Sequence, residues 1–133
     1  MTQDPYQQFK HLTPAEQDYV KRHPMHVPAI KRSRDLAFAE ARRKFGINGH
    51  NDASDAFRHC FWSAILTRDI GYQYALAFTT AHETSPTNPP AERAMDLHNN
   101  AVGLEIGRQG GSDPSLSNAC MAAWKAGRLK VLK

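Results

Sequence analysis

Three short groups of polar residues, all between residues 51 and 100, contain the side chains best suited to chemistry in this sequence. They are Asn51-Asp52-x-x-Asp55-x-x-Arg58-His59, Ala81-His82-Glu83 and Asp96-x-x-Asn99-Asn100. The surrounding segments are rich in Phe, Trp, Leu, Ile and Ala, so several of these polar groups must enter the interior. Because an unpaired buried polar group costs on the order of 1–3 kcal/mol, the pattern favours a polar site between helices that moves protons or holds a metal.

Helical spacing suggests different roles for these side chains. Asp55 and His59 are four residues apart on one helix face, where the carboxylate can orient the imidazole. The expected catalytic residues are His59, His82, Glu83 and Asp96. The residues expected to orient these groups, or to hold a substrate oxygen as it gains charge, are Asp55, Arg58, Asn99 and Asn100.

The same residue types leave the choice between a metal ion and a histidine base open. If a divalent metal is bound, the expected ligands are Asp55, His59, His82 and Asp96. The chain has no His-Glu-x-x-His or Cys-x-x-Cys motif, and neighbouring residues on a helix point in different directions. The sequence therefore predicts a site that activates water, with the cofactor unknown.

Clear helix start and stop signals surround these groups. Thr13-Pro14-Ala15-Glu16 forms a capping box for a short helix, and Pro28 and Gly46 bound a longer basic helix. Four further helices are expected over about 51–67, 71–82, 90–109 and 113–127, and residues 128–132 alternate like a short strand or tail. The expected fold is all-α: a compact single-domain bundle of five or six helices with at most a short C-terminal strand.

The third and fifth of these helices are expected to be buried and adjacent. Apolar residues cover most of the circumference of the third helix. On the fifth, Asp96, Asn100, Gly103 and Gly107 lie on one stripe. A glycine inside a helix costs about 1 kcal/mol relative to alanine, and a closely packed neighbouring backbone is the usual reason for it. The stripe should therefore carry Asp96 and Asn100 inward.

Composition sets broader limits on the molecule. The chain has 133 residues, so one domain over 1–133 can bury a core without disulfides. Its two cysteines, Cys60 and Cys120, are expected to be buried free thiols. The net charge of +4 favours an anionic partner such as nucleic acid, anionic lipid or the bacterial wall.

Neither a membrane span nor a conventional signal peptide is expected. The chain has no uninterrupted apolar run of spanning length, which argues against stable transmembrane insertion. The segment from Met1 to Pro5 is polar and lacks the basic and apolar regions of a secretory signal. If the protein is secreted, a signal-independent machine or a carrier polypeptide must export it.

The motif-bearing region also resembles a known group of bacterial proteins. The motifs are DAFRHCFW over 55–62, AHE over 81–83 and MDLHNNAVG over 95–103, followed by a Gly127-Arg128-Leu129 turn. They are similar to C-terminal domains of polymorphic toxins, including Rhs-type and type VI secretion effectors. The resemblance covers residues 48–131 and leaves the two helices within 1–46 outside it.

This resemblance implies an antibacterial setting. The domain would be secreted without a conventional signal peptide, on a carrier of a type VI secretion system, and would act in the periplasm of a target cell. An acidic immunity protein would neutralise it. With the His/carboxylate residues, we expect a hydrolase that acts on an anionic substrate of the bacterial cell envelope.

Three alternatives compete with this interpretation. A lysozyme-like glycosidase would use Glu83 as the acid and Asp96 as the second carboxylate, although residues 84–90 are too rich in proline for the usual β-hairpin. A Cys–His amidase would pair Cys60 with His82 or His98, but Cys60 lies in the middle of a helix. In a non-enzymatic binding or inhibitory module, the polar residues would only specify helix packing.

Overall fold

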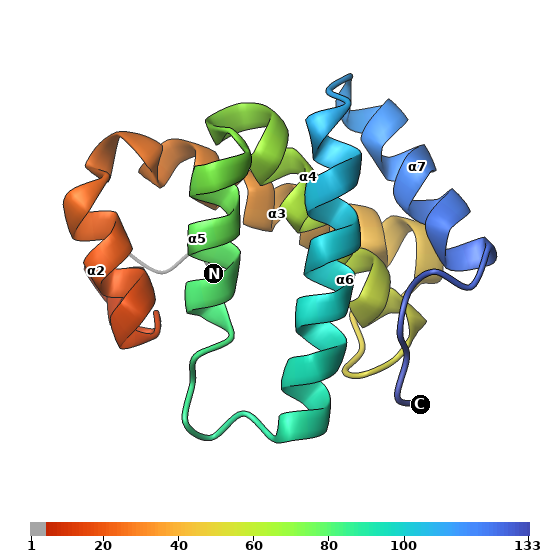
Figure 1. The fold of residues 1–133 in the computed structure, drawn as a ribbon, viewed down its shortest axis with the longest axis horizontal. Helices are drawn as coiled ribbons and strands as arrows, with labels where there is room; N and C mark the ends of the chain where they lie inside the picture. The colour runs from red at the N-terminus through yellow and green to blue at the C-terminus, as the bar shows by residue number, and fades with distance from the viewer. Residues whose placement is uncertain (1–4) are drawn as a thin grey trace.

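Seven α-helices surround one core in the computed structural model, which describes residues 5–133 (Figure 1). The helices are α1 (Pro5–Lys10), α2 (Pro14–Arg22), α3 (Val27–Phe45), α4 (Ala53–Ile70), α5 (Tyr72–His82), α6 (Pro90–Arg108) and α7 (Asp113–Lys125). A 3-10 turn, η1 (Pro24–His26), joins α2 to α3. The expected all-α fold is confirmed: α2–α7 are the expected helices, and α1 is an additional one. Residues 1–4, which carry most of the polar N-terminal segment, lie outside the described residues.

Local capping explains where the helices near the site begin. Thr13 caps α2, and the Glu16 side chain accepts a hydrogen bond from the Thr13 backbone N–H at 2.9 Å. Asp52 caps α4 by accepting a hydrogen bond from the Asp55 N–H at 3.0 Å. α3 ends at Gly46, which adopts a left-handed conformation with φ of 76°.

The central helix is α4, which packs against α3, α5, α6 and α7. It shares its most extensive contact with α6, as expected from the glycine stripe. A Cβ atom at Gly103 would collide with the carbonyl oxygen of Cys60, and one at Gly107 would collide with that of Ala64. The two glycines therefore let the α6 backbone approach α4 closely, which brings the N-terminal half of α6 beside His59.

The C-terminal residues form a pinned tail, and no strand occurs within residues 5–133. Asn99 holds this tail with both ends of its amide: Nδ2 donates to the Lys130 carbonyl at 2.9 Å, and Oδ1 accepts from the Lys130 N–H at 2.8 Å. The Leu132 N–H donates to the Asn51 carbonyl at 3.1 Å. Asn99 was expected to orient a catalytic group or substrate, and in the structure its amide instead binds the backbone of Lys130 in the tail.

Replacing Asn99 with alanine is expected to lower the free energy of unfolding by about 2 kcal/mol, because two hydrogen bonds are lost at a fully buried side chain. Urea unfolding measures this change, and hydrogen exchange at Lys130 should accelerate. His98→Ala is the matched control, since the exposed His98 makes one bond to the same tail, at the Arg128 carbonyl. Equal costs for the two variants would contradict the proposed pinning.

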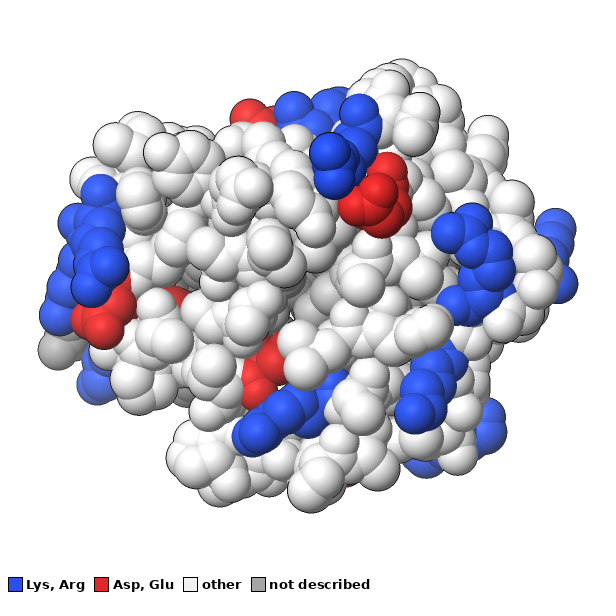
Figure 2. Space-filling view, in the orientation of Figure 1, with Lys and Arg blue, Asp and Glu red and all other residues white. Residues whose placement is uncertain are grey.

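The two cysteines are buried free thiols, as expected, and the described helices agree with the expected lack of transmembrane insertion. Cys60 and Cys120 are free, buried thiols whose Sγ atoms lie 3.2 Å apart. Of the helices described over residues 5–133, none is both long and apolar enough to cross a membrane. On the face shown in Figure 2, Lys and Arg side chains form separate groups, and acidic atoms are visible between α5 and α6. The positive charge is thus dispersed over this face.

Candidate active site

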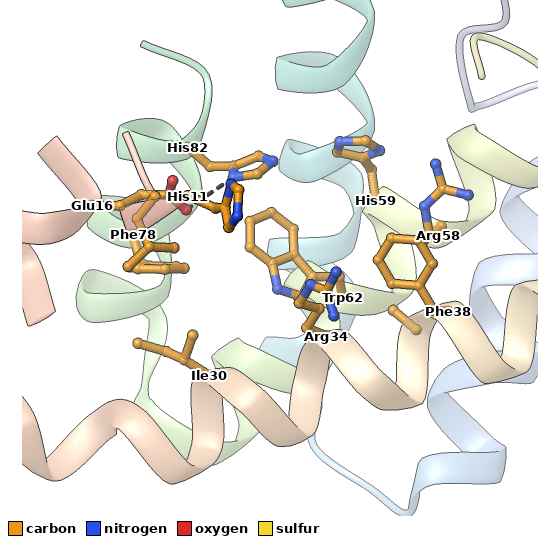
Figure 3. Close-up of a pocket in the computed structure, with 12 residues that line it drawn as sticks. His11, Glu16, Ile30, Arg34, Phe38, Arg58, His59, Trp62, Phe78 and His82 are labelled. Atoms are coloured by element: carbon orange, nitrogen blue, oxygen red, sulfur yellow. Dashed lines mark hydrogen bonds and ion pairs between the residues drawn. The ribbon is translucent and has the colours of Figure 1, made fainter. Parts of the chain in front are cut away.

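Two histidines meet where α4 and α5 come together. His59 lies on α4 and His82 is the last residue of α5, and their ring centroids are 6.4 Å apart. Trp62, one turn after His59, lies beside both rings, with centroid distances of 6.2 Å to His59 and 5.1 Å to His82. Figure 3 shows the two imidazoles pointing toward one another above Trp62. The indole therefore packs against one side of each imidazole.

Each imidazole is held by a carboxylate at Nδ1. His59 Nδ1 lies 3.0 Å from Asp55 Oδ1 and 3.1 Å from the Asp55 carbonyl oxygen. His82 Nδ1 lies 2.9 Å from Glu16 Oε2. When Nδ1 carries the proton, the neutral ring has its lone pair on Nε2. The two pairs therefore leave both Nε2 atoms available for a proton or a metal.

Glu16 is the site residue that the sequence did not reveal. Its capping box predicted only a structural role, and one carboxylate oxygen does serve the cap. The second oxygen binds His82, and the Thr13 hydroxyl donates to the Ala81 carbonyl at 2.9 Å, so the start of α2 docks on the end of α5. Glu16 is buried with 3% of its surface exposed. Since Glu16 and His82 are 66 residues apart, helix periodicity cannot predict this pair.

A Glu16→Gln substitution is expected to lower the pKa of His82. Burial alone lowers this pKa, but the hydrogen bond and charge of Glu16, with the charge of Glu83, raise it above 6.5 in spite of the repulsion from His59. The pair therefore stabilises the fold below pH 6.5, and this contribution is lost as the pH rises through the raised pKa. Glutamine can retain the cap without the charge.

NMR titration of the His82 ring in chelator-treated protein measures this effect. Gln17→Glu adds a carboxylate at the next position of α2 and serves as the matched control, because the Gln17 amide donates to the carbonyls of Phe9 and Leu12. An unchanged His82 titration in Glu16→Gln would show that Glu16 does not control the imidazole.

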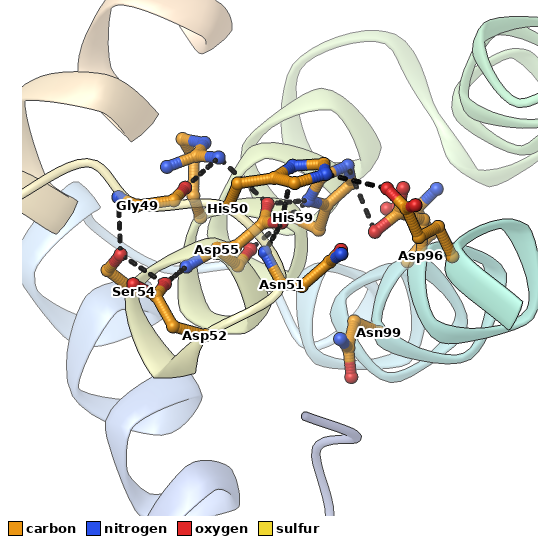
Figure 4. A network of polar contacts seen from close by, with 12 residues as sticks. Gly49, His50, Asn51, Asp52, Ser54, Asp55, His59, Asp96 and Asn99 are labelled. Carbon is orange, nitrogen blue, oxygen red and sulfur yellow. Dashed lines mark hydrogen bonds and ion pairs between the residues drawn. The ribbon is translucent and has the colours of Figure 1, made fainter. Parts of the chain in front are cut away.

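Asp55 is the centre of a second group of contacts, shown in Figure 4. Its Oδ1 accepts from Arg58 Nη2 at 2.8 Å, and its Oδ2 accepts from the Asn51 N–H at 2.7 Å. Burial would raise the pKa of Asp55, but His59, the Asn51 N–H and Arg58 together hold it below 3.8. Asp55 is therefore a charged residue that positions His59.

Arg58 supports the same group. Besides Asp55, its guanidinium donates to the Gly49 carbonyl at 3.1 Å and to Asn48 Oδ1 at 3.2 Å. Its face also packs on Phe38, with 4.8 Å from Cζ to the ring centroid. Arg58 also lines a cavity beside His59, so the expectation that it holds a substrate oxygen stays a prediction. Its role here is to orient Asp55.

Two further carboxylates face the other nitrogen of His59. His59 Nε2 lies 3.8 Å from Glu83 Oε2 and 3.7 Å from Asp96 Oδ1. Asn100 Nδ2 donates to Glu83 Oε2 at 3.2 Å, while Asn100 Oδ1 accepts from the Ser63 hydroxyl at 3.2 Å. Asn100 therefore orients Glu83 from α6; its place on the glycine stripe predicted that it points inward, but not this partner. Asp96 Oδ1 is a buried atom with no hydrogen-bond partner among the described residues.

The electrostatics reflect this crowding of acids around one imidazole. Burial raises the pKa of Asp96 to about 6, and although His59 opposes this rise, Glu83 and Asp55 add to it. Burial lowers the pKa of His59, but Asp55, Asp96 and Glu83 outweigh it and hold the pKa above 6.5. The site thus concentrates negative charge in a volume that is largely closed to water.

A cavity of about 360 Å³ borders the two imidazoles (Figure 3). Its walls are largely apolar and combine residues of α2, α3, α4 and α5; they include Leu12, Ile30, Phe38, Trp62 and Phe78. Arg34 and His11 supply polar groups at the exposed edge. In the described part of the chain, Glu83 and Asp96 are not among the lining residues, so they lie behind the histidines.

The chain matches one family of domains over residues 17–128, a family described as a domain of unknown function, DUF6973. Because the match spans most of the sequence, this protein belongs to the DUF6973 family. The matched part of this DUF6973 domain contains His59, His82, Glu83 and Asp96 and begins one residue after Glu16. It also includes α3 and most of α2, which lie upstream of residue 48. No solved structure matches the chain.

The DUF6973 domain brings most of the expected site residues together, and their possible metal ligands form two groups that share His59. Donor atoms of Asp55, His59 and Asp96 lie within 4.8 Å of one another, with Asp55 at Nδ1 of the ring and Asp96 facing Nε2 (Figure 4). Donor atoms of His59, His82 and Glu83 also lie within 4.8 Å of one another, so Glu83 joins the expected metal set.

The Cys–His alternative is contradicted by the packing. Cys60 is fully buried, and its sulfur contacts Cys120 on α7. His98 is exposed and binds the C-terminal tail. A buried thiol without a histidine partner is neither activated nor accessible to a substrate.

Proposed function

We propose that this domain is a hydrolase that acts as an antibacterial effector on an anionic substrate of the bacterial cell envelope. The observation that carries the hydrolase proposal is the meeting of two imidazoles, which border a cavity, with two carboxylates that lie behind them. His59, His82, Glu83 and Asp96 supply the reacting groups, and each histidine is positioned by a separate carboxylate. Such a set is suited to activating water and protonating a leaving group.

The burial of the groups suggests how they divide the proton transfers. Glu83 and Asp96 lie behind His59, where they can accept a proton from water held near His59 Nε2. The His82 side chain is 46% exposed and borders the cavity, so it is placed to give a proton to the leaving group. A carbonyl or phosphoryl centre that enters the cavity would then be attacked from the side of the carboxylates.

The effector setting is supported by the resemblance of the three motifs to polymorphic toxin domains and by the net charge of +4. Export on a type VI carrier without a signal peptide, action in the periplasm of a target cell and inhibition by an acidic immunity protein follow from that setting. An immunity protein should cover the cavity beside His82, because occluding this opening with complementary charge blocks access to the site.

The two other classes explain the geometry less well. A glycosidase acid must contact the glycosidic oxygen. Glu83 is only 3% exposed, and its carboxylate accepts a hydrogen bond from Asn100. A purely structural network should satisfy its buried polar atoms. Asp96 Oδ1 instead lacks a hydrogen-bond partner among the described residues, and burial and the neighbouring Glu83 raise the pKa of Asp96 to about 6, which favours a group that exchanges a proton or binds a ligand.

Expression of the domain in a bacterial host, in a cytoplasmic and a periplasm-directed version, tests the proposal. We expect the periplasmic version to stop growth, its His82→Gln variant to be harmless, and the matched His98→Gln variant to remain toxic. Toxicity of the cytoplasmic version alone would overturn the envelope target. A fully toxic His82→Gln variant would overturn the role of the site.

A further inference from the structure

We propose that His59, His82, Glu83 and Asp96 form a binding site for one divalent transition-metal ion of the Zn²⁺ class. The metal site rests on the proposed hydrolase function, since the bound ion would activate the attacking water. Two imidazole nitrogens and two carboxylate oxygens form a mixed set that suits zinc or manganese better than calcium or magnesium. The ligands come from α4 (His59), the last residue of α5 (His82), the residue after it (Glu83) and α6 (Asp96).

The distances between the donor atoms support a shared ion. Ligands around a tetrahedral zinc ion, at about 2.0–2.2 Å from the metal, lie about 3.3–3.6 Å from one another. His59 Nε2 lies 3.8 Å from Glu83 Oε2 and 3.7 Å from Asp96 Oδ1. These pairs are too long for hydrogen bonds. Donor atoms of His59, His82 and Glu83 already lie within 4.8 Å of one another, and Asp96 would complete the set from the other side of His59 Nε2.

The orientation of the ligands is already arranged from outside the cluster. Asp55 holds His59 at Nδ1, Glu16 holds His82 at Nδ1, and Asn100 binds the Glu83 carboxylate. A carboxylate or amide behind each ligand is the usual support of a metal site, because it sets the histidine tautomer and fixes the direction of the lone pair. Three of the four proposed ligands have such a partner.

Charge and burial indicate that a cation belongs at this point. Glu83 is buried, and the side chain of Asp96 is 15% exposed, yet the two carboxyl groups face the same imidazole nitrogen. Buried carboxylates are stable only when they are paired, hydrogen-bonded or bound to metal. Asp96 Oδ1 has no hydrogen-bond partner among the described residues, and burial and the neighbouring Glu83 raise the pKa of Asp96, so a proton or a cation is needed between these carboxyl groups.

The remaining side of the cluster is accessible. His82 is partly exposed and borders the cavity, which gives water and substrate a route to the ion. A zinc ion at such a position lowers the pKa of its bound water to about 7. In this arrangement His59 and His82 are both ligands through Nε2. The proton released from water therefore goes to Glu83 or Asp96, and in the metal-bound form one of these groups, rather than His82, returns it to the leaving group.

Calorimetric titration of the chelator-treated full chain with ZnCl₂, MnCl₂ and MgCl₂ tests the site. We expect one Zn²⁺ per chain with a dissociation constant of about 1 μM or lower, and a higher melting temperature with the ion. Glu83→Gln and Asp96→Asn should each weaken Zn²⁺ binding at least about tenfold. The matched control His98→Gln should bind like the wild type, and Mg²⁺ should produce no comparable heat.

The outcomes separate this inference from the proposed function. If neither Zn²⁺ nor Mn²⁺ binds, or if both carboxylate variants bind Zn²⁺ like the wild type, the metal site is refuted. Full hydrolytic activity of the chelated protein would refute the metal site while preserving the hydrolase. One Zn²⁺ lost in both variants, in a protein that is harmless in both compartments, would support the metal site and overturn the effector function.

Discussion

Replacing His59 with glutamine is expected to lower the rate at which the protein degrades isolated envelope material by about a thousandfold or more. His59 lies among three carboxylates of the site: Asp55 binds Nδ1, and Glu83 and Asp96 face Nε2. Glutamine cannot serve as a base at neutral pH, and its amide, although it reaches the position of Nε2, is a much weaker zinc ligand than imidazole. Both ways of activating water are therefore lost with the same substitution.

The measurement must separate chemistry from folding, because the His59 side chain is 13% exposed and packs beside Trp62. Circular dichroism and urea unfolding of His59→Gln should show that the helical fold is retained. His98→Gln, a histidine variant outside the cluster, should keep the wild-type rate. Activity of a folded His59→Gln protein within tenfold of the wild type would exclude His59 from the mechanism.

Replacing Gly103 with alanine is expected to lower the free energy of unfolding by about 3 kcal/mol or more, since overpacking typically costs about 1–3 kcal/mol and the contact here is with a rigid backbone. Helix propensity alone predicts the opposite sign, a gain of about 1 kcal/mol. The collision of the new Cβ with the Cys60 carbonyl should decide the outcome, because it forces α6 away from α4. For a domain with about 5–15 kcal/mol of stability, this is a large loss.

Ala101→Gly is the matched control on the same helix, because Ala101 is exposed and should report only the intrinsic helix preference of about 1 kcal/mol. Urea unfolding of both variants and of the wild type gives the comparison. A Gly103→Ala protein that is as stable as the wild type would show that α4 and α6 do not pack as closely as the structure has them.

Sequence alone determined the features that depend on neighbours along the chain. The helices α2–α7 follow from capping residues, prolines and apolar periodicity, which act within a few residues. The Asp55–His59 pair was predicted because residues four apart share a helix face. The Gly103 and Gly107 stripe predicted a close helix contact because glycine inside a helix is costly without one.

Only the tertiary structure decided which partner each polar side chain takes across the molecule. The sequence predicts the bond of Glu16 to the Thr13 N–H at the start of α2. Its bond to His82 exists only because α2 docks on α5. Asn99 and Asn100 are adjacent on α6, yet one binds the C-terminal tail and the other binds Glu83. Helix periodicity defines the face on which a residue lies, whereas its partner depends on how helices distant in sequence pack against that face.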